Sequence, residues 1–456
     1  MDIYQEKLDE QRKYFLTGET RNIRHRKNNL KRLYEAIKEN EDMILQALAE
    51  DLGKSRTEGY ATEVGIVLNE LRNAIRNVSK WARKKSVPTA LLHFPSRSYV
   101  IKEPIGSVLI MSPWNYPFQL TMVPFIGALT AGCTVIVKPS RYSQATSKAM
   151  KHIINDYFPE KECFLFEGGR EVNTALLDLK WDYIFFTGSP NVGKIVLSKA
   201  AENLTPVTLE LGGKSPVIIT EHSDEVLAAK RLIYGKFLNL GQTCVAPDYI
   251  LIHKSKTKRF LSEVEKGIKK AFGEDPISSP DYGKIINRHH YERLLGLIKG
   301  SPVYYGGKSD DEKLKIAPTI LFPVCVDEPV MQEEIFGPVM PVIEYEDLDE
   351  AIKFINDRPH PLALYIFSDR KSEIEKVHGL TLFGGGCIND AIMHIVSHNL
   401  PFGGVGNSGM GSYHGKRSFD TFTHEKGILK HYKWPDITLR NPPYKGKDKI
   451  IRLMLH

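Results

Sequence analysis

The chain has 456 residues, of which 42% are hydrophobic and 26% are charged, and its formal net charge is +7. This length exceeds what one hydrophobic core usually holds, so we expect two or three domains. The surplus of lysine and arginine is spread along the chain in small clusters, which are typical of solvated helix faces and argue against a nucleic-acid site.

The cysteines and the chain ends indicate a reducing compartment. The five cysteines are widely spaced and include no Cys-x-x-Cys pair: Cys133, Cys163, Cys244, Cys325 and Cys387. This pattern argues against a disulfide framework and against structural zinc, so we expect no metal. The N-terminus has no apolar signal region, and no segment approaches the ~20 apolar residues that a membrane span needs. We therefore expect a cytoplasmic protein with no membrane span.

Apolar residues at helical spacing open the chain. They predict helices over residues 30–37, 44–48 and 64–75, and Gly53 is placed to end the second of them. The pattern then changes to short apolar runs that end in turn residues. These runs predict buried strands over residues 108–111, 134–137, 163–166, 183–186 and 207–211. Amphipathic stretches over residues 147–157 and 192–201 separate several of them, and this alternation is typical of a parallel, doubly wound sheet.

A similar alternation resumes after Glu210. Strands are predicted over residues 216–220, 249–253 and 341–344. Helices are predicted over residues 224–238, 256–272 and 348–357. Because a parallel sheet this far along a chain usually belongs to a new core, we expect a second α/β domain that ends near residue 395. The remainder is rich in glycine and then basic, with a loop at Asn441-Pro442-Pro443.

One cysteine lies in a segment typical of a nucleophile. The stretch GQTC ends at Cys244, and LELGGK upstream of it places the carboxylate of Glu210 beside a glycine-rich turn. A thiol attacks carbonyl carbon, and a carboxylate activates the water that releases the covalent product. A lone cysteine is also among the residues most often buried and inert, so the surrounding motifs must decide between the two interpretations.

A strand, a turn and a helix follow one another in FFTGSPNVGK. Gly188 ends the strand, and the helix opens near Asn191, where free backbone N–H groups favour a phosphate. The spacing is Gly-x-x-x-x-Gly rather than the Gly-x-Gly-x-x-Gly of the usual dinucleotide fingerprint, and Ile195 stands where a P-loop carries Ser or Thr. The segment therefore suits either a phosphate site or an ordinary strand-turn-helix connection.

Three further positions are candidates for binding or catalysis. Asn115 lies in PWNYP, a loop after a strand, where its amide could donate to an oxyanion or form an Asx turn. Lys138 follows the next strand and could meet a phosphate, a ribose or solvent. Glu334 precedes an aromatic residue and a turn in EEIFGP, although paired glutamates are commonly surface residues.

Together these segments resemble a known family. The chain is similar to the NAD(P)-dependent aldehyde dehydrogenases, and within them to the class 3 branch of fatty and aromatic aldehyde dehydrogenases. The resemblance runs from about Asn29 to the Phe422 region. It rests on these stretches, in this order: PWNYPF, VIVKPS, FTGSPNVGK, LELGGKSP, GKFLNLGQTCVAPDY, QEEIFGPVMP and NLPFGGVGNSGMGSYHGKRSFDTFTH. The last of them and GQTCVAPDY point to class 3.

The resemblance implies a mechanism and assigns residues to it. Cys244 resembles the nucleophile that forms a thiohemiacetal with the aldehyde, and its backbone N–H and the Asn115 amide resemble the oxyanion hole. After hydride transfer, Glu210 resembles the base that activates water to hydrolyse the thioester. The resemblance also implies cofactor contacts: Gly188, Ser189 and Gly193 at the pyrophosphate turn, Lys138 at the adenosine ribose, Glu334 and Phe336 at the nicotinamide riboside, and Leu211 and Trp114 at the nicotinamide.

One position departs from the family pattern. After Lys138-Pro139-Ser140 most relatives carry a glutamate that binds the adenosine ribose hydroxyls, whereas this chain has Arg141. A carboxylate repels a 2′-phosphate, and a guanidinium binds one in a forked geometry. We therefore expect NAD or NADP as the cofactor, with NADP used at least as well as NAD, unless Arg141 points into solvent.

The resemblance also implies an architecture and a partner. We expect an α/β fold with two doubly wound parallel-sheet domains, one Rossmann-like and one catalytic, and a small oligomerisation or bridging element. The expected boundaries are residues 1–205 for the N-terminal helices and the NAD(P)-binding domain, 206–395 for the catalytic domain, and 396–456 for a segment that returns to the cofactor domain. We expect a homodimer that oxidises medium- or long-chain aliphatic or aromatic aldehydes to carboxylic acids.

Two alternatives and the substrate stay open at this stage. In a CoA-acylating aldehyde dehydrogenase, CoA replaces water as the attacking group, and Glu210 argues against this. In an inactive structural or binding homologue, Cys244 would have no chemical role. Tyr60, Tyr116 and His398 are candidate walls of the aldehyde pocket, although lone aromatic residues also serve as ordinary packing. The basic tail KGKDKIIRLMLH is too short to span a bilayer, yet it suits weak attachment to a membrane surface.

Overall fold

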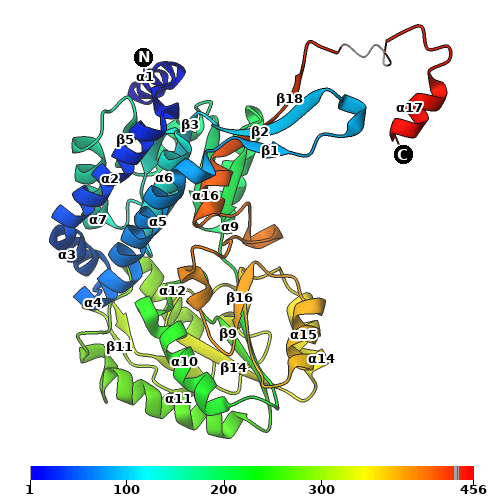
Figure 1. Ribbon diagram of the computed structural model, residues 1–456. Helices are drawn as coiled ribbons and strands as arrows, with labels where there is room; N and C mark the ends of the chain where they lie inside the picture. The colour runs from blue at the N-terminus through cyan, green and yellow to red at the C-terminus, as the bar shows by residue number, and fades with distance from the viewer. Residues whose placement is uncertain (1, 436–438, 440, 456) are drawn as a thin grey trace.

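The computed structural model of the chain describes residues 2–435, 439 and 441–455. Two α/β parts form the body, one above the other in Figure 1, and a narrow antiparallel arm projects from the upper part. Parallel strands make up most of both large sheets. The predicted α/β fold with doubly wound parallel sheets is confirmed.

Helices open the chain, as the apolar spacing predicts. Their bounds are α1 (Ile3–Leu16), α2 (Ile23–Glu39), α3 (Glu41–Leu52), α4 (Arg56–Gly59) and α5 (Gly65–Trp81), with a π-helical turn at Tyr60–Val64. Gly53 ends α3 with a φ of 67°, the left-handed conformation that favours glycine at this position. Helix α1 lies outside the predicted elements because its sequence is mostly polar, and Leu8 and Gln11 are its buried residues.

The upper sheet contains the five strands predicted between residues 108 and 211. Its strands are β3 (Ser107–Met111), β4 (Thr134–Lys138), β5 (Cys163–Leu165), β6 (Tyr183–Thr187) and β7 (Val207–Glu210), all parallel, with β17 (Gly409–Met410) antiparallel at the edge. Helices α6 (Gln119–Ala131), α7 (Gln144–Lys151), α8 (Arg170–Leu177) and α9 (Pro190–Glu202) connect them. The strand order β17-β7-β6-β3-β4-β5 contains the doubly wound order of a dinucleotide-binding sheet.

The winding reverses between β3 and β6. From β3 the chain moves outward to β4 and β5, and it then returns to the other side of β3 for β6 and β7. The pairing sets Met111 beside Lys138 and Phe186, and Thr187 beside Glu210, so these strands end at one edge of the sheet. Open α/β sheets bind their ligands in the crevice at this position.

The lower sheet has seven strands. Its parallel strands are β8 (Pro216–Ile219), β9 (Tyr249–His253), β13 (Thr319–Leu321), β14 (Val339–Tyr345), β15 (Ala363–Phe367) and β16 (Gly385–Ile388), with β10 (Val303–Tyr305) antiparallel at one edge. Its helices include α10 (Glu225–Phe237), α11 (Thr257–Phe272), α12 (Arg288–Ile298), α13 (Pro329–Gln332), α14 (Leu348–Asn356) and α15 (Lys371–Leu380). Strands β11 (Ser309–Asp310) and β12 (Lys315–Ile316) pair antiparallel in a separate two-stranded sheet. The sequence does not predict the strands β13, β15 and β16 of this sheet of seven. Strand β13 is short, and β16 is rich in glycine.

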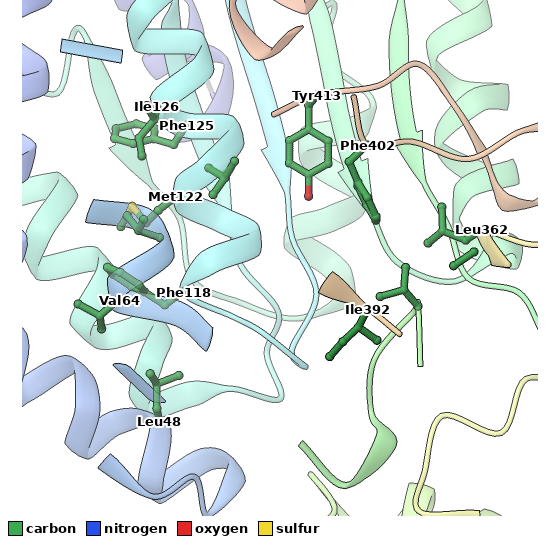
Figure 2. Packing of buried hydrophobic residues seen from close by; sticks show 14 of the residues in the cluster. Leu48, Val64, Phe118, Met122, Phe125, Ile126, Leu362, Ile392, Phe402 and Tyr413 are labelled. Atoms are coloured by element: carbon green, nitrogen blue, oxygen red, sulfur yellow. The ribbon is translucent and has the colours of Figure 1, made fainter. Parts of the chain in front are cut away.

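Helix α6 is buried on every side. Each of its residues from Gln119 to Ala131 is buried, so it shows no amphipathic period, and the sequence predicts no helix there. Figure 2 shows its residues Met122, Phe125 and Ile126 in the core beside the N-terminal helices. A Cβ at Gly127 would lie 2.7 Å from the Cβ of Ser418, so glycine permits the close approach of α16 (Lys416–Thr421).

The C-terminal segment returns to the upper part and enters the arm. The arm pairs β1 (Lys85–Val87), β2 (Ser96–Pro104) and β18 (Thr423–His431), and α17 (Asp448–Leu455) lies near its tip in Figure 1. Residues 441–443 form the predicted loop. None of the helices in the described part of the chain has the length and apolarity that a bilayer crossing requires.

The expected domain boundaries stay predictions. The boundary after residue 205 falls in front of β7, yet β7 pairs with β6, so the upper sheet extends to Glu210 before the chain leaves it. Strands β8 to β16 of the lower sheet lie between residues 216 and 388.

Candidate active site

Cys244 lies in a turn between α10 and β9. Just before it, Asn239 and Leu240 have φ values of 50° and 52°, which reverse the backbone. The Ala246 N–H donates to the Thr243 carbonyl at 2.9 Å and closes the turn around the half-buried cysteine. Burial raises the pKa of Cys244 to about 12, and the nearby charges of Glu334 and Glu210 act in the same direction. The thiol is therefore protonated in this state, and attack requires that it lose its proton within the site.

Glu210 ends β7 inside the molecule. Glu210 is only 2% exposed, and neither of its carboxylate oxygens has a hydrogen-bond partner among the described residues. Burial alone raises the pKa of Glu210 well above its ordinary value. A buried carboxyl group without partners costs free energy, so it points to a functional role rather than to a structural one.

Asn115 joins the loop after β3 to the cysteine turn. Its Nδ2 donates to the carbonyl oxygen of Gln242 at 3.0 Å, two residues before Cys244. The next residue makes a second connection, because the hydroxyls of Tyr116 and Thr243 lie 2.8 Å apart. These contacts hold an amide donor beside the candidate nucleophile.

A wide cavity of about 1040 Å³ runs along the edge where β3, β6 and β7 end. It brings together ten of the residues predicted from the sequence: Trp114, Asn115, Gly188, Ser189, Gly193, Glu210, Leu211, Cys244, Glu334 and Phe336. Their positions in the chain span more than two hundred residues, so the fold and not the local sequence assembles this site.

One end of the wide cavity suits a phosphate group. Helix α9 begins there, with Ser189 as its N-cap accepting from the Val192 N–H at 3.4 Å. Its first N–H groups carry the positive end of the helix dipole. A Cβ at Gly193 would lie 2.6 Å from the Cδ2 of Leu211, so a larger residue would displace the leucine from the cavity wall.

The other end suits a ribose and an aromatic ring. The rings of Trp114 and Phe336 meet edge to face, with their centroids 5.3 Å apart. Glu334 accepts a bond from the Gly213 N–H, but its Oε1 is buried without a partner, and burial raises its pKa to about 8. Ribose hydroxyls supply the donors that this oxygen lacks. The cavity residues therefore fit a nicotinamide dinucleotide.

Two predicted cofactor residues lie outside the lining of this cavity. Lys138 is buried, its Nζ donates to the Pro139 carbonyl at 2.7 Å, and burial lowers its pKa to about 8. Arg141 is exposed, and its guanidinium lies 5.1 Å from the centre of the Tyr142 ring. Lys138 is the last residue of β4 and Arg141 follows it, one strand further along the same sheet edge, so their predicted cofactor roles stay predictions.

A second, narrow cavity of about 60 Å³ also begins at Cys244. Most of its walls are apolar or aromatic, and they include Ile66, Tyr116, Leu120, Leu238, Ile392, Val396, Phe402, Tyr413 and His414. Figure 2 shows Tyr413, Phe402 and Ile392 on one side of the core, with the ring of Tyr413 pointing down between the chain segments. Tyr116 lines this cavity, and its role as a wall of an aldehyde pocket stays a prediction.

Tyr60 and His398 lie outside the described walls of the narrow cavity, so their roles in an aldehyde pocket stay predictions. Tyr60 is 41% exposed, and its ring lies over its own helix, 3.2 Å from where a Cβ on Gly65 would be. Its neighbours Ala61 and Thr62 line the cavity instead. His398 lies two residues beyond Val396 and borders a separate, polar hollow beside Lys80. Sequence proximity alone did not indicate which of these side chains faces inward.

The wide cavity also contains residues that the sequence did not indicate. The ring of His290 lies 5.0 Å from that of Trp114, and its Nδ1 is buried without a partner. Arg293, one turn along α12, donates to the carbonyl of Ile335 at 2.7 Å and so fixes the segment that carries Glu334. Neither residue lies in one of the recognised motifs, so a sequence signal for them was missing. Among the described residues there is no group of acidic, histidine and cysteine side chains that could hold a metal ion.

Comparison with known proteins decides the family. Residues 5–428 match the model described as the aldehyde dehydrogenase family. The chain belongs to this family. It is 48% identical to the 4,4'-diaponeurosporen-aldehyde dehydrogenase of Staphylococcus aureus (strain NCTC 8325 / PS 47), over 99% of each chain. It is 44% identical to aldehyde dehydrogenase family 3 member B1 of Mus musculus, over 100% of this chain and 97% of that protein.

Solved structures of aldehyde dehydrogenases have the same fold. The substrate-bound state of Staphylococcus aureus AldH matches with a TM-score of 0.99 at 47% identity, and each chain is covered completely. A betaine aldehyde dehydrogenase of Staphylococcus aureus in complex with NAD+ matches with a TM-score of 0.84 at 26% identity, over 95% of this chain and 88% of that one. The predicted family is confirmed, and this aldehyde dehydrogenase is an oxidoreductase that converts aldehydes to acids.

The buried carboxyl group of Glu334 makes the stability of this aldehyde dehydrogenase depend on pH. Its pKa of about 8 lies above the ordinary value of 4.5, so folding favours the protonated form. Raising the pH from 4.5 through 8 therefore removes free energy of unfolding, and Glu334→Gln abolishes that loss. We expect the variant to melt about 2 °C above the wild type at pH 9 and at the same temperature at pH 5.

The neighbouring Glu333→Gln is the matched control, because Glu333 is exposed and pairs with Arg293 at the surface. Melting curves of the cofactor-free protein at both pH values measure the effect. An equal difference at pH 5 and pH 9 would contradict the assignment of a raised pKa to Glu334.

Proposed function

We propose that this enzyme oxidises aldehydes through a covalent thioester on Cys244, which water activated by Glu210 then hydrolyses. The observation that carries the proposal is that Cys244 lines both cavities. An aldehyde whose carbon chain occupies the narrow apolar cavity presents its carbonyl to the sulfur. The wide cavity, which Cys244 also lines, would hold the cofactor.

The first step is attack of the Cys244 sulfur on the carbonyl carbon. The C–S bond forms as the thiol proton passes to solvent water, and the π electrons of the carbonyl bond move to its oxygen, which takes up negative charge. Asn115 Nδ2, which donates to Gln242 in the resting state, and the Cys244 N–H become the donors to this oxygen. Each such donor is worth ~3–4 kcal/mol in related oxyanion holes. NAD(P), when bound, accepts the hydride from this carbon and leaves a thioester.

Hydrolysis of the thioester needs a base. Glu210 has no competing hydrogen bonds in the protein, and burial makes its carboxylate a stronger base than usual. It takes a proton from water as the oxygen attacks the carbonyl carbon, the C–S bond breaks, and the carboxylic acid leaves while the sulfur recovers a proton. A CoA-acylating enzyme has no use for this carboxylate, which makes the hydrolytic pathway the better supported one.

Removing the base should trap the covalent intermediate. We expect Glu210→Gln to lower steady-state kcat about 100-fold or more while retaining one rapid turnover per active site, because acylation precedes the step that needs the base. Rapid-mixing absorbance at 340 nm measures the burst, and mass spectrometry detects the acyl group on Cys244.

The matched controls are two cysteine variants. Cys244→Ala should show neither burst nor turnover, whereas Cys387→Ala, a partly buried cysteine outside both cavities in the described structure, should retain activity. Full steady-state activity in Glu210→Gln would contradict its role as the base, and acceleration of the wild type by CoA with formation of acyl-CoA would favour the alternative reaction.

For the cofactor, we propose that NADP is used at least as well as NAD. Arg141 lies three residues beyond Lys138, the last residue of β4, and its exposed guanidinium contacts the Tyr142 side chain. A 2′-phosphate at this sheet edge would give the guanidinium an anionic partner. The negative charge of Glu171 also favours the charged forms of Lys138 and Arg141. The preference between NADP and NAD therefore depends on the balance of these three charges and not on Arg141 alone.

For the substrate, we propose medium- or long-chain aliphatic or aromatic aldehydes. The narrow cavity is lined mainly by apolar and aromatic side chains, so each methylene that is buried there would contribute about 0.8 kcal/mol of binding free energy. Small polar aldehydes gain nothing from this surface.

One kinetic panel tests both proposals. We expect kcat/KM to rise several-fold with each added pair of methylenes from short to medium chains, and expect kcat/KM for NADP to equal or exceed that for NAD. The panel includes 4,4'-diaponeurosporen-aldehyde, for which the Staphylococcus aureus relative is named. Arg141→Glu should reduce NADP use about 10-fold or more and leave NAD use unchanged. A flat chain-length profile, or an NAD preference that Arg141→Glu leaves untouched, would refute the respective proposal.

We also propose a cytoplasmic homodimer. The projecting arm exposes large apolar side chains, with Trp434 84% and Phe94 58% exposed, and a second copy would cover such a surface. Light scattering should give twice the chain mass of 51.7 kDa, and Trp434→Ser should shift the protein toward a monomer. A monomeric wild type would contradict the dimer, and recovery of the native enzyme with membranes after cell fractionation would contradict the compartment.

A further inference from the structure

A fully buried ion pair lies behind the candidate oxyanion donor. Lys54, just after α3, and Glu63, in the π-helical turn before α5, have side chains that are 1% and 0% exposed. The Lys54 Nζ lies 2.5 Å from the Glu63 Oε1. Both residues lie outside the sequence motifs, and the described walls of the two cavities contain neither of them.

Glu63 fixes the start of α6. Its second carboxylate oxygen accepts from the backbone N–H groups of Phe118 at 2.9 Å and Gln119 at 3.0 Å. These groups belong to the first turn of the fully buried helix, where a carboxylate also meets the positive end of the helix dipole. Asn115 lies three residues before Phe118, so the carboxylate sets where the loop that carries the amide enters the helix.

Lys54 contacts the loop itself. Its Nζ donates to the Asn115 backbone carbonyl at 3.4 Å and lies 4.0 Å from the centre of the Tyr116 ring. The same carbonyl accepts from Asn239 Nδ2 at 2.8 Å, and this amide also donates to the carbonyl of Gln242 at 3.2 Å. The backbone of Asn115 is thus held from two sides, while its side chain donates to Gln242.

The pair is poorly explained as a source of stability. Taking two charges out of water costs more than their attraction usually returns, and apolar side chains of the same volume often stabilise a core equally well. The contacts of this pair differ from those of an ordinary core pair. Apart from the bond between the two residues, their hydrogen bonds and ring contact among the described residues all belong to the 115–119 segment. The charge of Lys54 also acts on the Glu58 carboxyl group. The geometry therefore favours a role in placing that segment.

We propose that Lys54 and Glu63 are positioning residues that hold the Asn115 amide in register with the Cys244 turn. The proposal rests on the role of Asn115 as the oxyanion donor. Oxyanion stabilisation depends on donor placement within a few tenths of an ångström, and a misplaced group costs up to about 100-fold in rate. The effect falls on the transition state, so kcat changes and substrate binding does not.

The test removes both charges of the pair together. In Lys54→Met/Glu63→Gln, the glutamine carbonyl still accepts from the start of α6, while the contacts to Asn115 and Tyr116 are lost. We expect kcat to fall by roughly 10- to 100-fold with little change in KM for the aldehyde or the cofactor. An unchanged kcat, with or without a change in KM, would overturn the proposal.

A double-mutant cycle separates positioning from general damage. Asn115→Ala alone tests the proposed oxyanion role and should lower kcat about 100-fold or more. In the Asn115→Ala background, Lys54→Met/Glu63→Gln should change kcat by less than about twofold, because its effect passes through the missing amide. If Asn115→Ala is active, the oxyanion assignment fails and the positioning role fails with it. If the pair substitution still lowers kcat fully in that background, the positioning role alone is wrong.

Two further variants keep the test decisive. Asn239→Gly retains the left-handed backbone and removes the other donor to the Asn115 carbonyl. Its effect on kcat should also disappear in the Asn115→Ala background. This variant replaces the pair variant in the double-mutant cycle if the pair variant does not fold. The control is Lys256→Met/Glu225→Gln, a partly buried pair at the start of α10 with a 3.0 Å separation, which should leave kcat unchanged. An equal loss of kcat in this control would assign the effect to stability and overturn the proposal.

Discussion

The register of the upper parallel sheet is the constraint on which the site depends. Because β3, β6 and β7 run in the same direction, Met111, Phe186 and Glu210 finish near one edge, and the loops that follow them open onto one cavity. A shift of one residue would turn Glu210 toward the opposite face of the sheet and remove the carboxyl group from the cavity. The lower part of the molecule contributes the cysteine turn, and the site lies where these two sets of loops meet.

Burial determines the charge of the resting site. Cys244, Glu210 and Glu334 all have raised pKa values chiefly because each is taken out of water, and the charges of the two glutamates raise the pKa of Cys244 further. The site therefore favours the neutral forms of these acids. The positive charge of an oxidised nicotinamide ring bound in the wide cavity would favour the ionised forms of these groups.

The sequence predicts those parts of the structure that short segments determine. Gly53 as a C-cap, the alternating strands and the motif residues Asn115, Glu210 and Cys244 each follow from local chemistry or from the family resemblance. What it does not predict depends on packing between distant segments. Helix α6 has no periodic signal because it is enclosed on all sides, and Tyr60 faces away from the cavity although its neighbour Thr62 lines it. His290 reaches the site only because α12 packs beside Trp114.

The two-residue strand β17 has a consequence for the order in which the enzyme becomes complete. Gly409 pairs with Glu210, and the segment that follows supplies Tyr413 and His414 to the narrow cavity. A chain emerging from the ribosome presents the nucleophile, the base and the amide long before it presents these walls. Until its last segment is released, the nascent protein has its reactive cysteine without the enclosure that selects a substrate for it.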